Sequence, residues 1–184
     1  MGREQRPQIP GGLYHINTRG NRRAPIYLDD EDRVHFLQLL AKVIVRAKWS
    51  CHAYCLMTNH YHVLVETREP TISAGMELLN GQFARGFNAK YGLRGHVFED
   101  RFHHEVVEDD VQLLATGRYI VRNPVRAGMC ARAADWRWSS HAATAGTAAV
   151  PPFLSVDALL GMFGRDRAAG ARRYAAFVDD DAAD

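Results

Sequence analysis

The sequence predicts an α+β fold in which an antiparallel sheet carries two helices on one face. Three features lead to this prediction. Segments of alternating apolar and polar residues are typical of half-buried strands, and longer segments with apolar residues at helical spacing are typical of amphipathic helices. The segments follow one another in the order β-α-β-β-α-β-α, whose first six elements match the split βαβ, or ferredoxin-like, arrangement. The second face of the sheet is then free for a site or for the third helix.

The first strand and the first helix have clear boundaries in the sequence. Residues 12–18 alternate as a half-buried strand would, and Gly20-Asn21 provides a turn after it. Four acidic residues, 29–32, stand where the dipole of a following helix favours negative charge. Apolar residues then recur at helical spacing, so the sequence predicts an amphipathic helix over 30–47.

A hairpin and a second helix follow. Residues 50–57 and 60–66 have the composition of strands, and only Thr58-Asn59 separates them, which indicates a tight turn. Apolar residues at helical spacing predict a helix over 72–90. This helix contains three glycines, each of which costs up to about 1 kcal/mol relative to alanine.

The remaining elements lie between residue 96 and the C-terminus. The sequence predicts a fourth strand over 96–107 and a third helix over 109–123. Pro124 is expected to end that helix, because proline lacks the amide hydrogen and clashes with the preceding turn. We divide the chain into a domain over 1–140 and an appended segment over 141–184. The appended segment is predicted to comprise a linker rich in Ala, Thr and Gly over 141–150 and short helices over 155–163 and 165–178.

The composition is that of a globular protein. The chain has 184 residues, of which 47% are hydrophobic and 24% charged, and this balance excludes bulk disorder. A run of about 18 apolar residues is missing, so we expect no membrane span, and residues 1–12 lack the apolar core of a secretory signal. Three cysteines cannot form a closed set of disulfides, which favours a reducing, cytoplasmic setting.

The cations of the chain are mostly arginine. The net charge is only +2, but 20 of the 23 cationic residues are Arg. Arginine suits planar, bidentate contacts with phosphate. It also accompanies an alanine-rich composition, so charge alone leaves a nucleic-acid partner open.

Two histidines begin the second strand of the hairpin. Side chains alternate along a strand, so His60 and His62 share one face, about 7 Å apart at their α-carbons, while Tyr61 points to the other face. Two imidazoles at this spacing can converge on one divalent ion. The alternative is a pair of ordinary histidines at a strand edge. Further ligands could come from other histidines, namely His52, His96, His103 and His104.

The third helix carries a polar stripe beside its apolar one. The apolar stripe consists of Leu113, Leu114, Gly117, Ile120 and Val121, and the polar stripe consists of Gln112, Thr116, Tyr119 and Asn123. A carboxamide oxygen is a hard donor that suits Mg²⁺ or Mn²⁺. The alternative is a half-exposed tyrosine that covers the sheet, with Asn123 capping the helix.

Several segments together resemble the REP-associated tyrosine transposases, relatives of the single-tyrosine HUH transposases. A histidine pair is a weak signal by itself, but it becomes specific together with the block in which Tyr119 is followed by Asn123-Pro124-Val125-Arg126-Ala127-Gly128. The departures are small: Asn17 stands where a serine is common, and Val121-Arg122 where His-Leu is common. The resemblance is carried by residues 13–21, 53–62, 95–98, 101–102, 118–128 and 138–140, and residues 155–178 are similar to an extension of some longer members.

The resemblance implies the HUH nuclease fold, with the third helix carrying the catalytic tyrosine. It implies that Tyr119 is the nucleophile and that His60, His62 and Asn123 bind Mg²⁺ or Mn²⁺. The protein would then be a metal-dependent endonuclease and strand transferase that forms a 5′-phosphotyrosine link. Its substrate would be single-stranded DNA with a hairpin and a short guide tetranucleotide, in the bacterial cytoplasm beside the nucleoid.

Basic and aromatic residues are the candidates for contacts with that DNA. Phe98 and Phe102 could stack on unpaired bases, each worth roughly 1–3 kcal/mol, or could belong to the core. The polar candidates are Arg19, Asn21, Arg22 and Arg23 after the first strand, Arg118, Arg122 and Arg126 on the third helix, and Arg85 and Arg101 elsewhere. Each arginine has the alternative of a solvated surface charge.

Two other functions compete with this interpretation. The same fold could bind hairpin DNA without cutting it, or an unrelated His-x-His metalloenzyme could act on small molecules, for which we would expect a closed apolar pocket. The sequence identifies no clear general base. It also leaves open whether the protein is a monomer or a homodimer.

Overall fold

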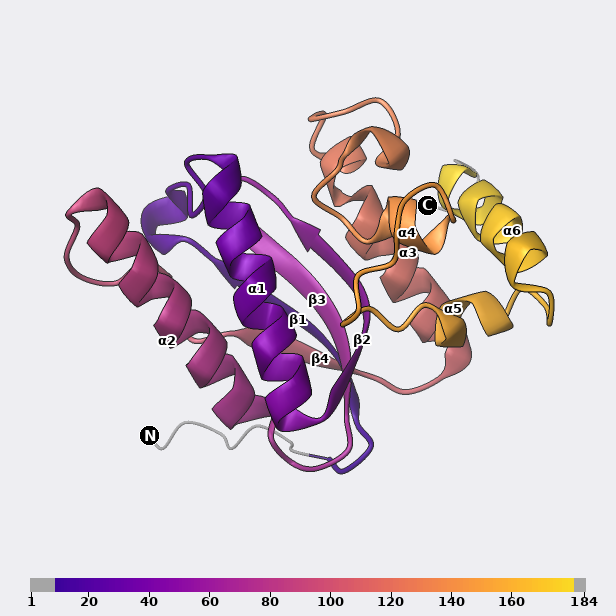
Figure 1. Ribbon diagram of the computed structural model, residues 1–184, viewed down its shortest axis with the longest axis horizontal. Helices are drawn as coiled ribbons and strands as arrows, with labels where there is room; N and C mark the ends of the chain where they lie inside the picture. The colour runs from indigo at the N-terminus through magenta and orange to yellow at the C-terminus, as the bar shows by residue number, and fades with distance from the viewer. Residues whose placement is uncertain (1–8, 181–184) are drawn as a thin grey trace.

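A four-stranded antiparallel sheet lies at the centre of the structure, a computed structural model that describes residues 9–180 (Figure 1). The strand order is β2-β3-β1-β4. The strands are β1 (Leu13–Arg19), β2 (Trp49–Leu56), β3 (His60–Thr67) and β4 (His103–Val107). β1 therefore pairs with β3 on one side and with β4 on the other. The two central strands are β3 and β1, which lie next to each other.

The helices form a layer on each face of the sheet. α1 (Asp30–Ala47) and α2 (Ile72–Tyr91) lie side by side on one face, while α3 (Asp110–Arg126) lies on the other (Figure 1). Tyr61 of β3 faces α1, where its ring centroid lies 4.5 Å from that of Phe36. The predicted ferredoxin-like α+β fold, with the third helix on the second face, is confirmed.

Local signals define the ends of α1. Asp29 accepts a hydrogen bond from the amide of Asp32, and the Asp32 side chain accepts one from the amide of Asp29, which makes a capping box. Lys48 ends the helix in the left-handed conformation with φ of 55°. The prediction of a helix over 30–47 therefore matches the structure.

The glycines of α2 have different surroundings. A Cβ added at Gly75 would lie 2.2 Å from Cζ2 of Trp49, so this glycine allows the indole to pack against the helix. At Gly81 the nearest atom to such a Cβ would be Nη1 of Arg85, at 3.5 Å. The helix therefore needs a glycine at the first position for packing, and packing does not require one at the second.

The fourth strand is shorter than predicted. β4 begins at His103, and residues 96–102 form a loop that returns to the sheet at a single bridge between Gly20 and Phe98. Asn17 pairs with His103. Four residues lie between Phe98 and His103, but only two lie between their partners Gly20 and Asn17. The two additional residues bulge out of the ladder, which explains why 96–107 is not one continuous strand.

The third helix continues past the proline that was expected to end it. α3 runs to Arg126 with Pro124 inside it. Proline cannot donate to the carbonyl of Ile120, but Nδ2 of Asn123 donates to the Tyr119 carbonyl at 2.9 Å and lies 3.5 Å from the Ile120 carbonyl. The asparagine side chain thus replaces the missing donor, and the prediction of an end near Pro124 is wrong for this reason.

Short helices follow α3 and cover its outer side. They are η2 (Ala133–Asp135), α4 (His141–Thr144), α5 (Asp157–Gly161) and α6 (Arg167–Asp179), and a further short turn, η1 (Asn21–Arg23), follows β1. The helical C-terminal extension is confirmed, although 141–144, predicted as linker, is helical and largely buried. The division of the chain at residue 140 stays a prediction.

Leu159 of α5 belongs to a second apolar cluster, between α3 and the sheet. A Cβ at Gly117 of α3 would lie 3.4 Å from the Leu159 side chain, so the two helices are in close contact. None of the described helices combines the length and the apolar character that a bilayer span requires.

Candidate functional site

A polar cavity of about 540 Å³ lies between the sheet and α3, and we call it the histidine cavity. β1, β3 and β4 form its floor and α3 forms its wall. Its lining consists of His15, Asn17, Arg19, His60, His62, Glu105, Ala115, Thr116, Tyr119 and Asn123. The structure thus brings together Tyr119, Asn123 and the two histidines of the hairpin.

Strand register places His60 and His62 on the cavity side. His60 pairs with Arg19 and His62 with Asn17, and all four side chains face α3. Tyr61 points the other way and donates a hydrogen bond to Asn80 on α2. The prediction that the two histidines share one face is therefore confirmed. His52, His96, His103 and His104 do not line this cavity.

A hydrogen bond fixes the ring of His60. Nδ2 of Asn59 donates to the carbonyl of Arg23 at 2.9 Å, so the Asn59 Oδ1 faces Nδ1 of His60, 2.8 Å away. An amide oxygen only accepts, so Nδ1 of His60 carries the proton. Its Nε2 then keeps a lone pair that a ligand can use.

The ring of His62 is held in a similar way. Its Nδ1 lies 2.9 Å from Nε2 of His15. Its Nε2 is buried and has no hydrogen-bond partner among residues 9–180. A buried polar nitrogen without a partner is costly unless an ion or a ligand completes it.

Burial keeps these imidazoles neutral. Desolvation, with a smaller contribution from Arg19, lowers the pKa of His60 to about 4. Desolvation, together with the neighbouring His15 and His60, lowers the pKa of His62 to about 3. The pKa of His15 is also lowered, because desolvation outweighs the attraction of Glu105. Neutral imidazole is the form that coordinates a metal ion.

Tyr119 stands over the histidines. Its ring centroid lies 5.7 Å from that of His62 and 5.8 Å from that of His15, edge to face in both pairs. The side chain is partly open to solvent, with 38% of its surface exposed. The guanidinium of Arg126 lies 5.2 Å from its ring centroid. A substrate can therefore reach the tyrosine beside a cation.

Asn123 supplies the third candidate ligand. Its Nδ2 is used by the Tyr119 carbonyl, which leaves Oδ1 as the atom that can face an ion. Within residues 9–180 no three His, Cys, Asp or Glu side chains gather into a metal cluster. An ion here would thus have two imidazoles and one amide oxygen as protein ligands, with phosphate and water oxygens to complete it. The unpartnered Nε2 of His62 fits such an ion.

Part of the predicted DNA-contacting set surrounds the cavity. Arg19 lines it and is exposed, and the exposed Arg126 lies over the ring of Tyr119, which also lines it. The turn that carries Asn21, Arg22 and Arg23 is exposed, and the bond from Asn59 to the Arg23 carbonyl ties this turn to the strand that begins at His60. These residues form a cationic rim beside the histidines.

Two of the predicted DNA-contacting arginines are buried instead. Nε of Arg118 donates to the carbonyl of Phe177 at 2.9 Å, and Nη1 of Arg122 donates to the carbonyl of Val178 at 2.7 Å. Asp180 accepts a further bond from Arg118 through its carbonyl. These guanidinium groups are buried and hold the C-terminal end of α6 against α3, so the structure does not bear out their prediction as exposed contacts.

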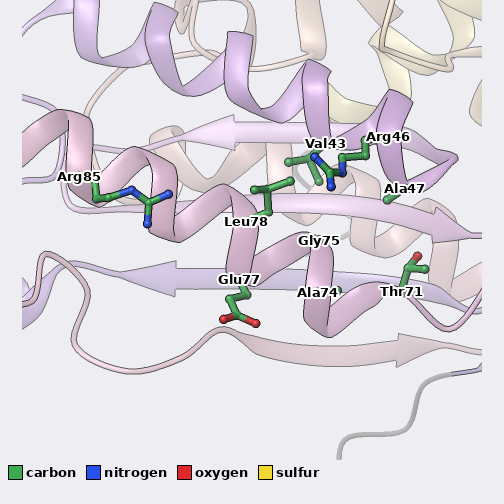
Figure 2. Close-up of a pocket in the computed structure, with 9 residues that line it drawn as sticks. All are labelled: Val43, Arg46, Ala47, Thr71, Ala74, Gly75, Glu77, Leu78 and Arg85. Carbon is green, nitrogen blue, oxygen red and sulfur yellow. The ribbon is translucent and has the colours of Figure 1, made fainter.

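Other predicted contacts lie away from the histidine cavity. Arg85 is on α2, across the sheet, where it lines a groove of about 440 Å³ together with Arg46 of α1 (Figure 2). Arg101 is exposed on the loop before β4. Phe98 and Phe102 are 9% and 5% exposed and belong to the core, the alternative that the sequence left open.

Sequence reasoning did not select His15 or Glu105 as site residues. The alternation of β1 puts His15 on the same face as Arg19, which is a usable signal. Their proximity to His62 depends on the register of three strands, in which His15 pairs with Leu64 and with Glu105. That register cannot be read from the sequence.

Comparisons with known proteins agree with this fold. The family described as "Transposase IS200 like" matches residues 9–123. A Haemophilus influenzae protein, provisionally named a REP-associated tyrosine transposase, is 27% identical over 152 residues, which cover 76% of this chain and 85% of that protein. A solved structure of a REP-associated tyrosine transposase bound to a REP hairpin has the same fold. Its TM-score is 0.68 at 20% identity, and the match covers 84% of this chain and 92% of that one.

Proposed function

The chain belongs to the IS200-like transposase family, and on this premise we propose that it cuts and rejoins single-stranded DNA next to hairpins through a covalent link to Tyr119. The observation that carries the proposal is the histidine cavity, in which Tyr119 and Asn123 of α3 face His60 and His62 of β3. The polar lining of this cavity argues against an enzyme for small apolar molecules, which would need a closed apolar pocket.

The proposed reaction is an in-line displacement at phosphorus. The Tyr119 oxygen forms a bond to the scissile phosphorus as the bond from phosphorus to the 3′ oxygen breaks. The phenol proton leaves through solvent and the departing 3′ oxygen gains a proton, so the products are a 5′-phosphotyrosine and a free 3′-hydroxyl. The diester energy stays in the new bond, so another 3′-hydroxyl can reverse the step without ATP.

His60, His62 and Asn123 would bind the divalent ion that the family implies. When bound, Mg²⁺ or Mn²⁺ supplies positive charge that polarises the scissile phosphate. The chain contributes neutral imidazoles, whose low pKa values of about 4 and about 3 keep them unprotonated at neutral pH. Arg126 over the Tyr119 ring supplies a further cation near the developing phenolate charge.

The hairpin substrate is supported by the relative whose structure contains a REP hairpin. In this chain the exposed Arg19, Arg22 and Arg23 provide phosphate contacts beside the cavity. Tyr119 lies over the histidines of its own chain. This supports cleavage in cis by a single protomer.

The test is incubation with hairpin-bearing single strands in Mg²⁺ or Mn²⁺, with the covalent adduct read on a denaturing gel. We expect an adduct that EDTA abolishes and that Tyr119→Phe removes while hairpin binding is kept. Tyr91→Phe is the matched control, because Tyr91 is on α2 and its hydroxyl contacts Asp29 and Asp32. An adduct that survives Tyr119→Phe overturns the assignment. Binding without any adduct in the wild type would identify a non-catalytic hairpin binder.

A further inference from the structure

A chain of polar contacts runs from the rim of the histidine cavity to His62. Oε2 of Glu105 on β4 lies 3.7 Å from Nδ1 of His15 on β1, and Nε2 of His15 lies 2.9 Å from Nδ1 of His62 on β3. The His15 and His62 rings are stacked, with centroids 5.2 Å apart and an interplanar angle of 22°. The three side chains come from three neighbouring strands, so the sheet itself sets their spacing.

We propose that His15 and Glu105 are positioning residues that hold His62 in the tautomer able to bind a metal ion through Nε2. The inference rests on the proposed function, in which His62 is a metal ligand. Neither His15 nor Glu105 would touch the ion or the DNA. They act through the proton on Nδ1 of His62.

The protons shared by these three side chains can be counted one contact at a time. Two neutral imidazoles in contact share one proton between the facing nitrogens, so one ring donates and the other accepts. A carboxylate accepts only, and therefore the charge of Glu105 favours a proton on Nδ1 of His15. The Nε2 of His15 is then an acceptor, Nδ1 of His62 is the donor, and Nε2 of His62 keeps its lone pair.

The opposite arrangement loses the contact with Glu105 and leaves Nε2 of His62 without a lone pair for a metal ion. If Nε2 of His15 donated, Nδ1 of His15 would have no proton to offer Glu105. Nε2 of His62 would then carry a buried proton with no acceptor among the described residues. Outer contacts of this kind commonly orient metal-binding histidines and change metal affinity by about 10–100-fold.

The chain contains a matched control pair. His52 is also a buried histidine beside a glutamate, with Nε2 3.3 Å from Oε2 of Glu66. It does not line the histidine cavity. Removing this pair changes the same residue types on the same sheet without touching His62.

Two measurements test the proposal on the full chain. The first is the imidazole tautomer of His62 in the metal-free protein, read from ¹⁵N chemical shifts. The second is Mn²⁺ binding without DNA, read by electron paramagnetic resonance. We expect a proton on Nδ1 in the wild type and its partial loss in Glu105→Gln, which removes the charge from an exposed side chain.

We expect Mn²⁺ affinity to fall by about 10–100-fold in His15→Leu and by less in His15→Gln, whose amide oxygen can still accept from His62. His52→Leu should leave affinity unchanged. A proton on Nε2 in the wild type, or a tautomer and affinity unaltered in both His15→Leu and Glu105→Gln, overturns the proposal. If the wild type binds no Mn²⁺, the metal role in the proposed function fails, while the tautomer still decides whether His15 and Glu105 orient the ring.

Discussion

Replacing Gly75 by alanine tests how tightly α2 packs on the sheet. The added Cβ would lie 2.2 Å from Cζ2 and 2.3 Å from Cη2 of Trp49. The indole cannot yield cheaply, because it is only 5% exposed and its Nε1 donates to Oγ1 of Thr71 at 2.9 Å. Overpacking of this kind typically costs about 1–3 kcal/mol, against which alanine in a helix regains up to about 1 kcal/mol.

With the full gain, the expected net effect of Gly75→Ala is a loss of up to about 2 kcal/mol of unfolding free energy, or a Tm lower by up to roughly 8 °C at this chain length. Gly81→Ala on the same helix is the control. Its Cβ would meet nothing closer than 3.5 Å, so we expect a gain of about 0.5–1 kcal/mol. Thermal and urea unfolding, followed by circular dichroism, measure both. Equal effects of the two variants, or a more stable Gly75→Ala, would refute the packing argument.

Three other predictions concern the elements around the site. Leu159→Ala should lower the unfolding free energy by about 2–5 kcal/mol in urea titrations, because this buried side chain fills the contact between α5 and α3; a change below about 1 kcal/mol would contradict that contact. Arg122→Met removes a charge-assisted bond to the Val178 carbonyl, so amide hydrogen exchange in α6 should become faster, and unchanged exchange would contradict the anchoring role. The hydrogen bond and charge of Lys90 hold the pKa of Asp29 at about 2, below its usual range, so the stability from this pair is present above about pH 4 and lost as the pH falls toward 2. Lys90→Met should therefore differ from the wild type in Tm at pH 7 but converge with it near pH 2, and a constant difference across that range would be inconsistent with the pairing.

Much of the fold follows from local patterns in the sequence. Alternation along residues 60–66 places His60 and His62 on one face, and the two-residue turn at Thr58-Asn59 fixes the hairpin. The polar stripe of α3 predicts that Tyr119 and Asn123 face the same direction, and both line the histidine cavity. These features depend on neighbours in the chain, so the sequence contains enough information to predict them.

The errors arise where distant segments decide the structure. In the sequence, Arg118 and Arg122 look like solvent-exposed cations. In the structure they donate to backbone carbonyls at the end of α6, about sixty residues later in the chain. Phe98 is buried in the core, and it lies on a bulged loop where the sequence predicted a regular strand. One error is local instead: Pro124 does not end the helix, because the side chain of the preceding asparagine donates to the Ile120 carbonyl.

The role of Tyr119 can be tested most directly by mass spectrometry of the trapped DNA–protein adduct. Trypsin cuts after Arg118 and Arg122, which isolates the peptide Tyr119-Ile-Val-Arg122. We predict that, after nuclease digestion, this peptide carries the mass of a 5′-phosphorylated nucleotide on its tyrosine and that the modification requires a divalent ion. A nucleotide attached to any other residue, or none on this peptide while DNA is being cleaved, would contradict the mechanism.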